Sequence, residues 1–502
     1  MIVEKLFLII ETEVLSMEQN LGEMLEYTCN RYPDRTSLIY KEKDISYVEL
    51  NRAVNAFGNS LRDLGIVKGD KVAIMLPNIP EFIISYFAIL KLGAVAVTIN
   101  ALSTSHELLY LLNNSDARAF ITIPSSAKRF EEIREEVPQC RHMITTDDPH
   151  GNISINGSME NNSFELEMPE ITGDDPAVMI YTSGLTGKPL GAVLTHRNLS
   201  TQTPLLRDIC DGTEHDRGLC IIPLFHSFGA VVNMLIIINT GASVVLVDQF
   251  KLESIFRAIE EKKVTYIAAV PRVFLGMLLL GGADDYDVSS LRFCITGGST
   301  MPPEYIPMFE DKFGVTLIQG YGLTEASPVC SVSRITEEQE PGSIGPPIKG
   351  VEAKIFDENG AELPSGDTGE LAIKGLNVMK GYYKNEQATK EVIKNGWLHT
   401  GDLARIDSKG HIFLEGRKKR MIITSGFNVY PIEVENVLRM HPEVRDARVT
   451  GKEDFIRGEI VSALIIKEKG SSVDEKDIMK HCRKYLSSYK SPREVNFTEA
   501  FD

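Results

Sequence analysis

Basic residues are in the minority in this chain of 502 residues. Lys and Arg total 53 against 70 Asp and Glu, which gives a formal net charge of −17. A surface that neutralises phosphates needs the opposite balance, so the composition argues against a nucleic-acid-binding protein. The one strongly basic run, Arg417 to Arg420 (RKKR), favours a solvated linker between domains over a targeting patch.

Paired cysteines and long apolar runs are also lacking. The seven cysteines stand singly, without Cys-x-x-Cys spacing, which argues against a disulfide framework or a zinc site and favours a reducing cytosol. No apolar stretch approaches membrane-spanning length, and the short run Leu6–Ile10 lacks a cleavage signature, so residues 1–16 read as an extension outside the fold. The sequence predicts a soluble, cytoplasmic protein, with peripheral membrane contact and oligomeric state left open.

What the chain does contain is an alternation of strand and helix patterns. Ser46 and Glu49 form a capping box before apolar positions that recur every three or four residues up to Gly65. Strand patterns at Val72–Leu76, Ala94–Thr98, Ala119–Ile123, Val244–Val247, Val264–Val270 and Arg292–Thr296 are separated by helical patterns such as Pro80–Leu92 and Thr104–Leu112. This alternation predicts an α/β fold of parallel sheets covered by helices.

The pattern of residues changes twice toward the C-terminus. Short β runs broken by Gly and Pro from Gly342 to Gly375 predict a small β-barrel-like unit. Past Gly416 a βαβ-like piece follows the basic run. We therefore expect a large domain over residues 17–415 and a small, mobile α+β domain over residues 416–502. The polar segment Asp147–Asn162 is expected to be an exposed loop.

Tyr181–Gly191 (YTSGLTGKPLG) is a turn rich in Gly, Ser and Thr between two apolar runs. Glycines let backbone N–H groups converge on an anion, hydroxyls add donors and Lys188 adds a positive charge. The candidate phosphate-binding residues are Thr182, Ser183, Gly184, Thr186, Gly187 and Lys188. The turn departs from the common nucleotide loop, which needs Gly at 182 and Ser or Thr at 189, so an ordinary polar turn is the alternative.

Two further turns follow strand patterns and contain glycine. Gly297, Gly298 and Ser299 come directly after one strand, and Gly320 to Glu325 (GYGLTE) after the next. Open α/β sheets bind ligands at such strand ends. In the second turn Gly320 and Gly322 admit a ligand, Tyr321 offers a flat face for a base, Thr324 a hydroxyl for phosphate and Glu325 an oxygen ligand for Mg²⁺. The alternatives are a packed tyrosine and a helix-capping acid.

These motifs together resemble the acyl-adenylate-forming superfamily. Tyr181–Gly191, Gly320–Glu325, Thr400–Asp402 and Gly416–Pro431 occur in its order and approximate spacing, within a likeness that runs from about Leu21 to Phe497. The superfamily includes acyl-CoA synthetases, carrier-loading adenylation domains and luciferases. The resemblance implies a two-step reaction. A carboxylate attacks the α-phosphate of MgATP to give acyl-AMP and pyrophosphate, and then the small domain rotates and the thiol of CoA takes the acyl group.

The same resemblance implies roles for individual residues. Thr182, Lys188, Thr324 and Glu325 would stabilise the charge that grows on the phosphates, with Glu325 holding Mg²⁺. Asp402 would accept hydrogen bonds from the ribose hydroxyls, and Arg417 would reach the same ribose. Ser425 and Gly426 resemble the backbone that lines the pantetheine channel. A turn aspartate and a loop glycine are the alternatives for Asp402 and Gly426.

The acid is indicated by Pro223–Gly229 (PLFHSFG), which resembles the acyl-pocket entrance, with Phe225, His226 and Gly322 as its candidate residues. Relatives that activate amino acids need an acidic residue after the Phe, because the substrate ammonium must be paired once desolvated. Here that residue is His226, which favours a fatty or aryl acid. A core or capping histidine is the alternative.

Departures from the family pattern predict slow formation of acyl-AMP. Leu185 and Leu190 stand where the family usually has Thr and Lys, and Arg420 stands at the joint where an acid or Lys is usual. The sequence stops at Asp502 before a Gly-Lys segment whose lysine serves adenylation in relatives, and Lys490 lies too early to take that role. The alternative functions are loading of a carrier protein's pantetheine, or binding of a nucleotide or acyl-adenylate without turnover.

Overall fold

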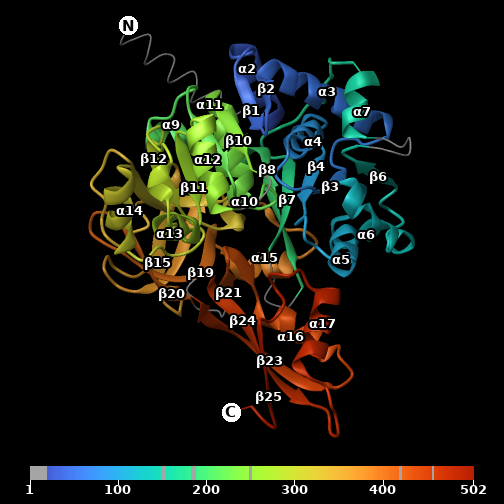
Figure 1. The fold of residues 1–502 in the computed structure, drawn as a ribbon, viewed down its shortest axis with the longest axis vertical. Helices are drawn as coiled ribbons and strands as arrows, with labels where there is room; N and C mark the ends of the chain where they lie inside the picture. Colours follow the sequence, from blue (N-terminus) through green and yellow to red (C-terminus); the bar gives the residue numbers. More distant parts are fainter. Residues whose placement is uncertain are drawn as a thin grey trace.

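Two mostly parallel sheets form the centre of the molecule (Figure 1). The computed structural model describes residues 20–147, 154–161, 163–182, 188–247, 251–417, 421–454 and 457–501. In spatial order the first sheet consists of β14 (Val329–Val332), β13 (Thr316–Gly322), β12 (Phe293–Thr296), β11 (Tyr266–Ala269), β9 (Arg217–Cys220), β10 (Ser243–Leu246), β1 (Thr36–Tyr40) and β2 (Lys43–Ser46). The second consists of β17 (Gly381–Tyr382), β8 (Leu190–Thr195), β7 (Pro176–Thr182), β4 (Val95–Thr98), β3 (Lys71–Met75), β5 (Ala117–Thr122) and β6 (His142–Thr145).

The inner strands of both sheets pair in parallel, and antiparallel pairing occurs at β1–β2, β13–β14, β7–β8 and β8–β17. Strand β4 is buried along its whole length because helices cover both faces of its sheet. Such strands have apolar residues at nearly every position, which is why they appear in the sequence as short, nearly continuous apolar runs. The predicted α/β class is confirmed.

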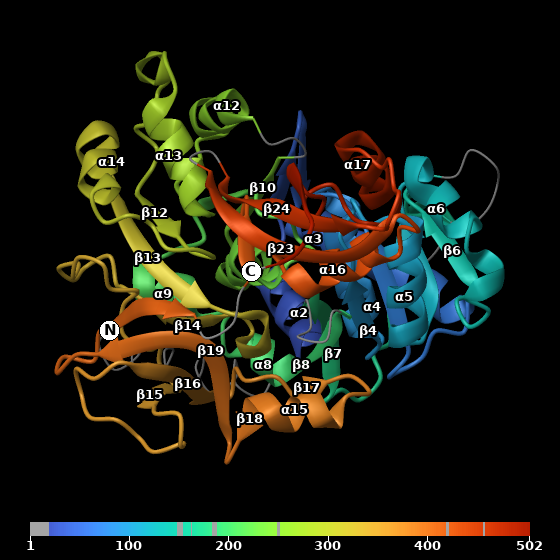
Figure 2. The same cartoon turned by 90° about the horizontal axis from the view of Figure 1, so that it is seen from below.

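Helices form layers between and outside the sheets. An apolar core between the two sheets joins residues of both to α2 (Leu21–Arg31), α3 (Tyr47–Asp63), α4 (Pro80–Lys91) and α11 (Ile236–Thr240). The far face of the first sheet packs on α12 (Leu252–Lys262), α13 (Pro271–Leu279) and α14 (Tyr305–Phe313), and that of the second on α5 (Ser105–Ser115) and α6 (Ala127–Glu131). Figure 2 shows these two outer layers on opposite sides of the molecule. The other α-helices in the described part of the large domain are α7 (Ile155–Asn161), α8 (His196–Ser200), α9 (Leu205–Cys210), α10 (Ser227–Ala230) and α15 (Glu386–Val392).

Local capping signals define the helix starts that the sequence predicts. Ser46 caps α3, with Glu49 completing the box, and Thr104 caps α5 in the same way with Glu107. Each box satisfies two backbone N–H groups that would otherwise lack a partner. Among the helices of the described chain, none is long and apolar enough to cross a membrane.

An antiparallel sheet follows the second turn motif. Its strands are β15 (Val351–Phe356), β16 (Gly369–Gly375), β19 (Trp397–Ile406), β18 (Ile393–Lys394) and β20 (Ile412–Arg417), and it has its own apolar core. It corresponds to the expected small β unit, as a twisted sheet with Asp402 and Arg417 paired on adjacent strands.

The last part of the chain forms a separate α+β unit at the lower end of Figure 1. Its sheet has the order β22 (Phe427–Val429), β21 (Ile422–Thr424), β24 (Gly458–Lys467), β23 (Val444–Asp454), with β25 (Glu494–Thr498) also on β24, and it packs on α16 (Pro431–Arg439) and α17 (Glu475–Tyr485). The change of sheet falls between β20 and β21, around the predicted joint. We call this unit the small domain.

Candidate active site

A cavity of about 1240 Å³ lies where the strand ends of the large domain face the small domain. Its lining contains most of the residues that the sequence singles out: Thr182, Lys188, Phe225, His226, Gly297, Gly298, Gly320, Tyr321, Gly322, Thr324, Glu325, Asp402, Arg417, Ser425 and Gly426. Ser299 is not part of the lining. Ser183, Gly184, Thr186 and Gly187, with Leu185, lie outside the described residues, as does Arg420. Residues from six separate sequence motifs therefore meet at one cavity.

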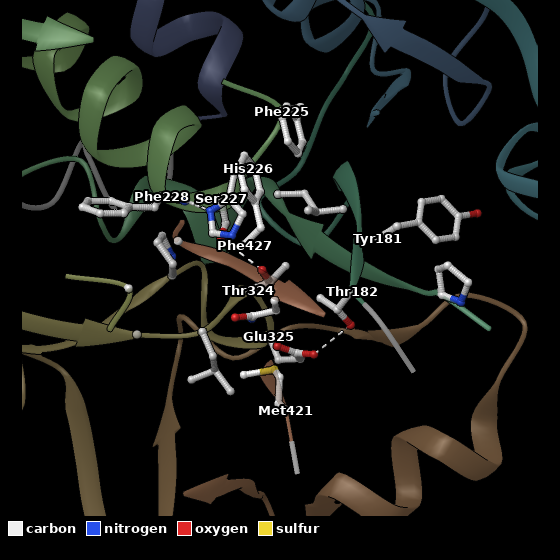
Figure 3. Close-up of a pocket in the computed structure, with 18 of the residues that line it drawn as sticks. Tyr181, Thr182, Phe225, His226, Ser227, Phe228, Thr324, Glu325, Met421 and Phe427 are labelled. Carbon is white, nitrogen blue, oxygen red and sulfur yellow. Dashed lines mark hydrogen bonds between the residues drawn. The ribbon is translucent and has the colours of Figure 1, made fainter. Parts of the chain in front are cut away.

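Glu325 stands at the centre of a hydroxyl cluster (Figure 3). Thr182, at the end of β7, donates to Oε1 of Glu325 at 3.1 Å, and the Tyr382 hydroxyl donates to the same oxygen at 2.8 Å. Burial and the Glu325 carboxylate raise the pKa of Tyr382 well above its ordinary value, so the phenol keeps its proton and its role as donor. Sequence reasoning missed Tyr382, which reaches the cluster through the pairing of β17 with β8.

The cluster fits Mg²⁺ in the manner of a nucleotide-dependent enzyme. Within the described parts of the chain, no group of three or more His, Cys, Asp or Glu side chains is arranged to hold a metal. Glu325 supplies one carboxylate, with the Thr182 and Thr324 hydroxyls on the same cavity wall. Mg²⁺ commonly binds through one or two carboxylates and completes its shell with substrate phosphates and water. The donor set therefore suits a metal that arrives with a nucleotide rather than a permanently caged ion.

Tyr321, Asp402 and Arg417 form one network, in which Tyr321 and Asp402 are buried and Arg417 is exposed. The Tyr321 hydroxyl donates to Oδ2 of Asp402 at 2.6 Å, and Nε of Arg417 lies 2.8 Å from Oδ1. Glycine is required beside Tyr321, because a Cβ on Gly322 would stand 2.0 Å from the carbonyl oxygen of Pro328. The network places a carboxylate, a guanidinium and an aromatic ring at one corner of the cavity, which suits a ribose and its base.

Replacing Asp402 with Asn is expected to weaken AMP binding by roughly 10-fold or more, because a hydrogen bond to a charged group contributes more than one to a neutral amide. Calorimetric titration with AMP would measure it. The matched control is Glu415→Gln, which removes a carboxylate paired with Arg405 on the adjacent surface of β20. Equal affinities of the two variants would contradict the ribose assignment.

His226 both caps a helix and lines the cavity. Its Nδ1 accepts the backbone N–H of Phe228 at the start of α10, which places the hydrogen of the neutral ring on Nε2. Burial lowers its pKa to about 4, so the ring is neutral near pH 7. Beyond α10 the chain makes a π-helical turn over Val231–Leu235 before α11, a distortion often found at functional sites. The capping interpretation thus holds, and the ring remains able to donate a hydrogen bond.

One lobe of the cavity is apolar. It lies against α9, α11 and the first sheet, and its lining comprises Leu205, Leu206, Ile209, Val232, Ile236, Tyr266 and Val332. All seven residues belong to the apolar core between the two sheets, and none of their side chains carries a charge. A hydrocarbon group buried here would gain about 25 cal/mol per Å², whereas an ammonium group would find no counter-ion.

The β21–β22 hairpin of the small domain forms a third part of the cavity wall. Gly426 has a φ of +84°, and a Cβ at this position would lie 2.8 Å from Cγ1 of Val270 in the large domain. The next residue, Phe427, stacks on Phe225 with ring centroids 6.4 Å apart and on Tyr489 at 4.6 Å. Figure 3 shows Phe427 beside His226, above the Thr324 and Glu325 side chains.

A polar corner for a nucleotide, an apolar lobe and a hairpin from a second domain, all on one cavity, define an enzyme of the adenylate-forming class. Comparison with known proteins supports this. The AMP-binding enzyme family matches residues 25–383, and the AMP-binding enzyme C-terminal domain matches residues 433–502. The chain therefore belongs to the AMP-binding enzyme family.

Individual relatives match along almost the whole chain. The long-chain-fatty-acid–CoA ligase of Bacillus subtilis is 32% identical over 95% of this chain and 91% of its own length. Among solved structures, the o-succinylbenzoate CoA synthetase MenE of Bacillus subtilis, bound to a product analogue, superposes with a TM-score of 0.85 at 28% identity, over 97% of this chain and 96% of that one. A fatty acyl CoA synthetase of Mycobacterium tuberculosis gives 0.75 at 29% identity, over 96% and 95%. The chain is an AMP-forming acid–thiol ligase of the acyl-CoA synthetase type.

Proposed function

We propose that this ligase activates a fatty acid with ATP and transfers the acyl group to CoA. The observation that carries the proposal is the apolar lobe, which opens onto the same cavity as Glu325 and the Tyr321–Asp402–Arg417 network. The fatty-acid ligase among the relatives supports an aliphatic acid. An acid held in the lobe would present its carboxylate toward the polar corner, where the α-phosphate would lie.

Each part of the cavity has a task in this reaction. The carboxylate of the acid attacks the α-phosphorus of ATP, a P–O bond breaks, and pyrophosphate leaves. Lys188 and the hydroxyls of Thr182 and Thr324 would offset the charge on the phosphates, and Mg²⁺ bound at Glu325 would neutralise more of it. In the second step the CoA thiol loses its proton to solvent and its sulfur attacks the acyl carbon of acyl-AMP. AMP then leaves with the electron pair of the broken C–O bond.

An acid-dependent assay of pyrophosphate release, followed by thioester detection, tests the proposal. Saturated acids of increasing chain length would be compared with benzoic acid and with amino acids, and CoA with a pantetheine-bearing carrier protein. We expect release and CoA thioester with aliphatic acids. Preference for the aryl acid or for the carrier would replace this function with one of the alternatives. Nucleotide binding without release under any condition would contradict turnover altogether.

We further propose that the first step is slow in this chain because Leu190 provides no positive charge. Leu190 is the first residue of β8, lines the cavity and pairs with Thr182 in the β7–β8 ladder. Its side chain therefore lies beside Thr182 at the expected phosphate site, where a hydrocarbon group cannot stabilise the charge of the phosphates.

Replacing Leu190 with Lys is expected to raise the rate of pyrophosphate release about 10-fold, since a charge near the transferring group stabilises the transition state more than the ground state. The matched control is Leu190→Met, which has similar length without charge. A rate for Leu190→Lys at or below that of Leu190→Met would refute the explanation.

A further inference from the structure

A lysine buried between the two domains is paired with one carboxylate from each. Nζ of Lys490 lies 3.0 Å from Oε1 of Glu107 in α5 of the large domain, and 2.6 Å from Oε1 of Glu433 in α16 of the small domain. The three side chains are only 9%, 11% and 10% exposed. The sequence singles out Lys490 only as a residue placed too early for catalysis, so this position has no assigned task.

The pairing keeps Glu107 and Lys490 charged. Burial alone would raise the pKa of Glu107, but the Lys490 charge together with hydrogen bonds from Ser487 and Thr104 brings it below its ordinary value. Burial alone would lower the pKa of Lys490, and Tyr489 with the two carboxylates raises it well above its ordinary value instead. A buried ion pair contributes modestly while complete, but the loss of one partner leaves an unpaired buried charge and is strongly unfavourable.

The network divides unequally between the domains. Lys490 and Glu433 belong to the small domain and would move together, whereas Glu107 is fixed at the first turn of α5. The Ser487 hydroxyl also donates to Oε2 of Glu107, at 2.6 Å. Movement of the small domain must therefore break the two bonds to Glu107 and expose its carboxylate to water.

The same interface positions the hairpin at the cavity. Tyr489 immediately precedes Lys490 and stacks on Phe427, next to Gly426. Nearby, the Thr104 hydroxyl donates to the carbonyl of Tyr485 at 3.3 Å, and the ring of His106 meets that of Tyr485 at 5.2 Å. The lysine thus connects α5 of the large domain to the hairpin through one aromatic contact.

We propose that Lys490 is a positioning residue, whose bond to Glu107 holds the small domain in the pose that brings Gly426 to the cavity. This proposal rests on the proposed function, in which that pose serves acyl transfer and the small domain moves between the two steps. Weakening the bond shifts the population away from the docked pose, and the transfer step slows in proportion to the docked fraction.

Glu107→Gln is the sharpest variant. Gln at this position keeps the capping box of α5, since Gln serves there as well as Glu, and it leaves Lys490 and Glu433 paired within the small domain. Lys490→Met removes both ion pairs and tests the whole network. Lys480→Met, an exposed lysine of α17, is the matched control for loss of a positive charge.

Docking can be measured without any substrate. The native cysteines of the chain are buried, so dyes would label introduced cysteines selectively. Asp63→Cys in the large domain and Lys469→Cys in the small domain are both at exposed positions. Single-molecule energy transfer between the two dyes would report the distance between the domains. Transfer to CoA from supplied acyl-AMP would be measured in the same variants. We expect Glu107→Gln and Lys490→Met to lower the ratio of docked to undocked molecules, and the transfer rate, by about 10-fold or more. Both variants remove the ion pair that crosses the interface, and Lys490→Met also leaves two buried carboxylates unpaired.

The outcomes separate this proposal from the function on which it rests. Unchanged distances in Glu107→Gln, relative to Lys480→Met, would overturn the positioning role, as would slower transfer without a change in distance. Shifted distances in a protein that makes no CoA thioester would overturn the proposed function and leave the positioning role standing. Thermal unfolding checks that Lys490→Met remains folded, and Glu107→Gln decides the question if it does not.

Discussion

Replacing Glu325 with Gln is expected to lower acid-dependent pyrophosphate release by two to three orders of magnitude, a loss comparable to removal of a transition-state donor. The amide oxygen of Gln can still accept the hydrogen bonds from Thr182 and Tyr382, so the cavity should keep its shape. What the variant loses is the negative charge that would hold Mg²⁺ on the phosphates. The measurement is single-turnover pyrophosphate release at saturating ATP and acid.

Two controls separate charge from packing. Glu338→Gln removes an exposed carboxylate from the same domain and should leave release unchanged. Tyr382→Phe keeps the Glu325 charge and removes one hydrogen bond, with an expected loss of about 10-fold or less. Binding of Mn²⁺ in the presence of ATP, followed by electron paramagnetic resonance, gives a readout independent of turnover. Tight Mn²⁺ binding and near-normal release in Glu325→Gln would contradict the metal role.

The fold was predictable where local sequence decides the structure. The capping boxes of α3 and α5 each involve residues three positions apart, and the buried parallel strands appear as uninterrupted apolar runs. The expectation of a loop at Asp147–Asn162 was wrong in part, because residues 155–161 form α7. That helix depends on distant contacts: Ile155 is buried in the main core, and the Ser158 hydroxyl bonds to that of Ser60. Propensity within a polar segment does not reveal such partners.

The candidate site was also predictable only in part. Glycine-rich turns at strand ends, and the order of the motifs along the chain, are features of the sequence itself, and they indicated most of the cavity lining. The roles of Tyr382 and Lys490 were missed because their partners are distant in the sequence. Glu325 lies 57 residues from Tyr382. Glu433 and Glu107 lie 57 and 383 residues from Lys490. Nothing in the local sequence distinguishes a lysine that pairs with a distant carboxylate from one that is solvated.

The two steps of the reaction place different demands on this architecture. Glu325, Thr182 and the Asp402 network belong to the large domain and are positioned by its sheets, so they should function in any pose of the small domain. Ser425, Gly426 and Phe427 belong to the small domain and line the cavity only when it is docked. Variants of the first group should therefore affect acyl-AMP formation, and variants of the second group should affect transfer.

Replacing Gly426 with Ala is expected to slow acyl transfer from supplied acyl-AMP to CoA by about 100-fold, since a displacement of roughly 1 Å at a reaction site can cost that much. The φ of +84° strains any side chain, and the added Cβ would meet Cγ1 of Val270 at 2.8 Å. The hairpin must then retreat from the large domain. Pyrophosphate release should change by less than about 3-fold, because the variant leaves the residues of the first step in place.

Gly470→Ala is the matched control for backbone strain. Gly470 lies in the same domain and also has a φ of +84°, but no atom lies within 4 Å of the position that a Cβ would occupy. Both variants therefore carry the same conformational penalty in the small domain, and only Gly426→Ala presses on Val270. If the two variants slow transfer equally, the effect comes from backbone strain, and the close approach of the hairpin to the large domain has no part in the second step.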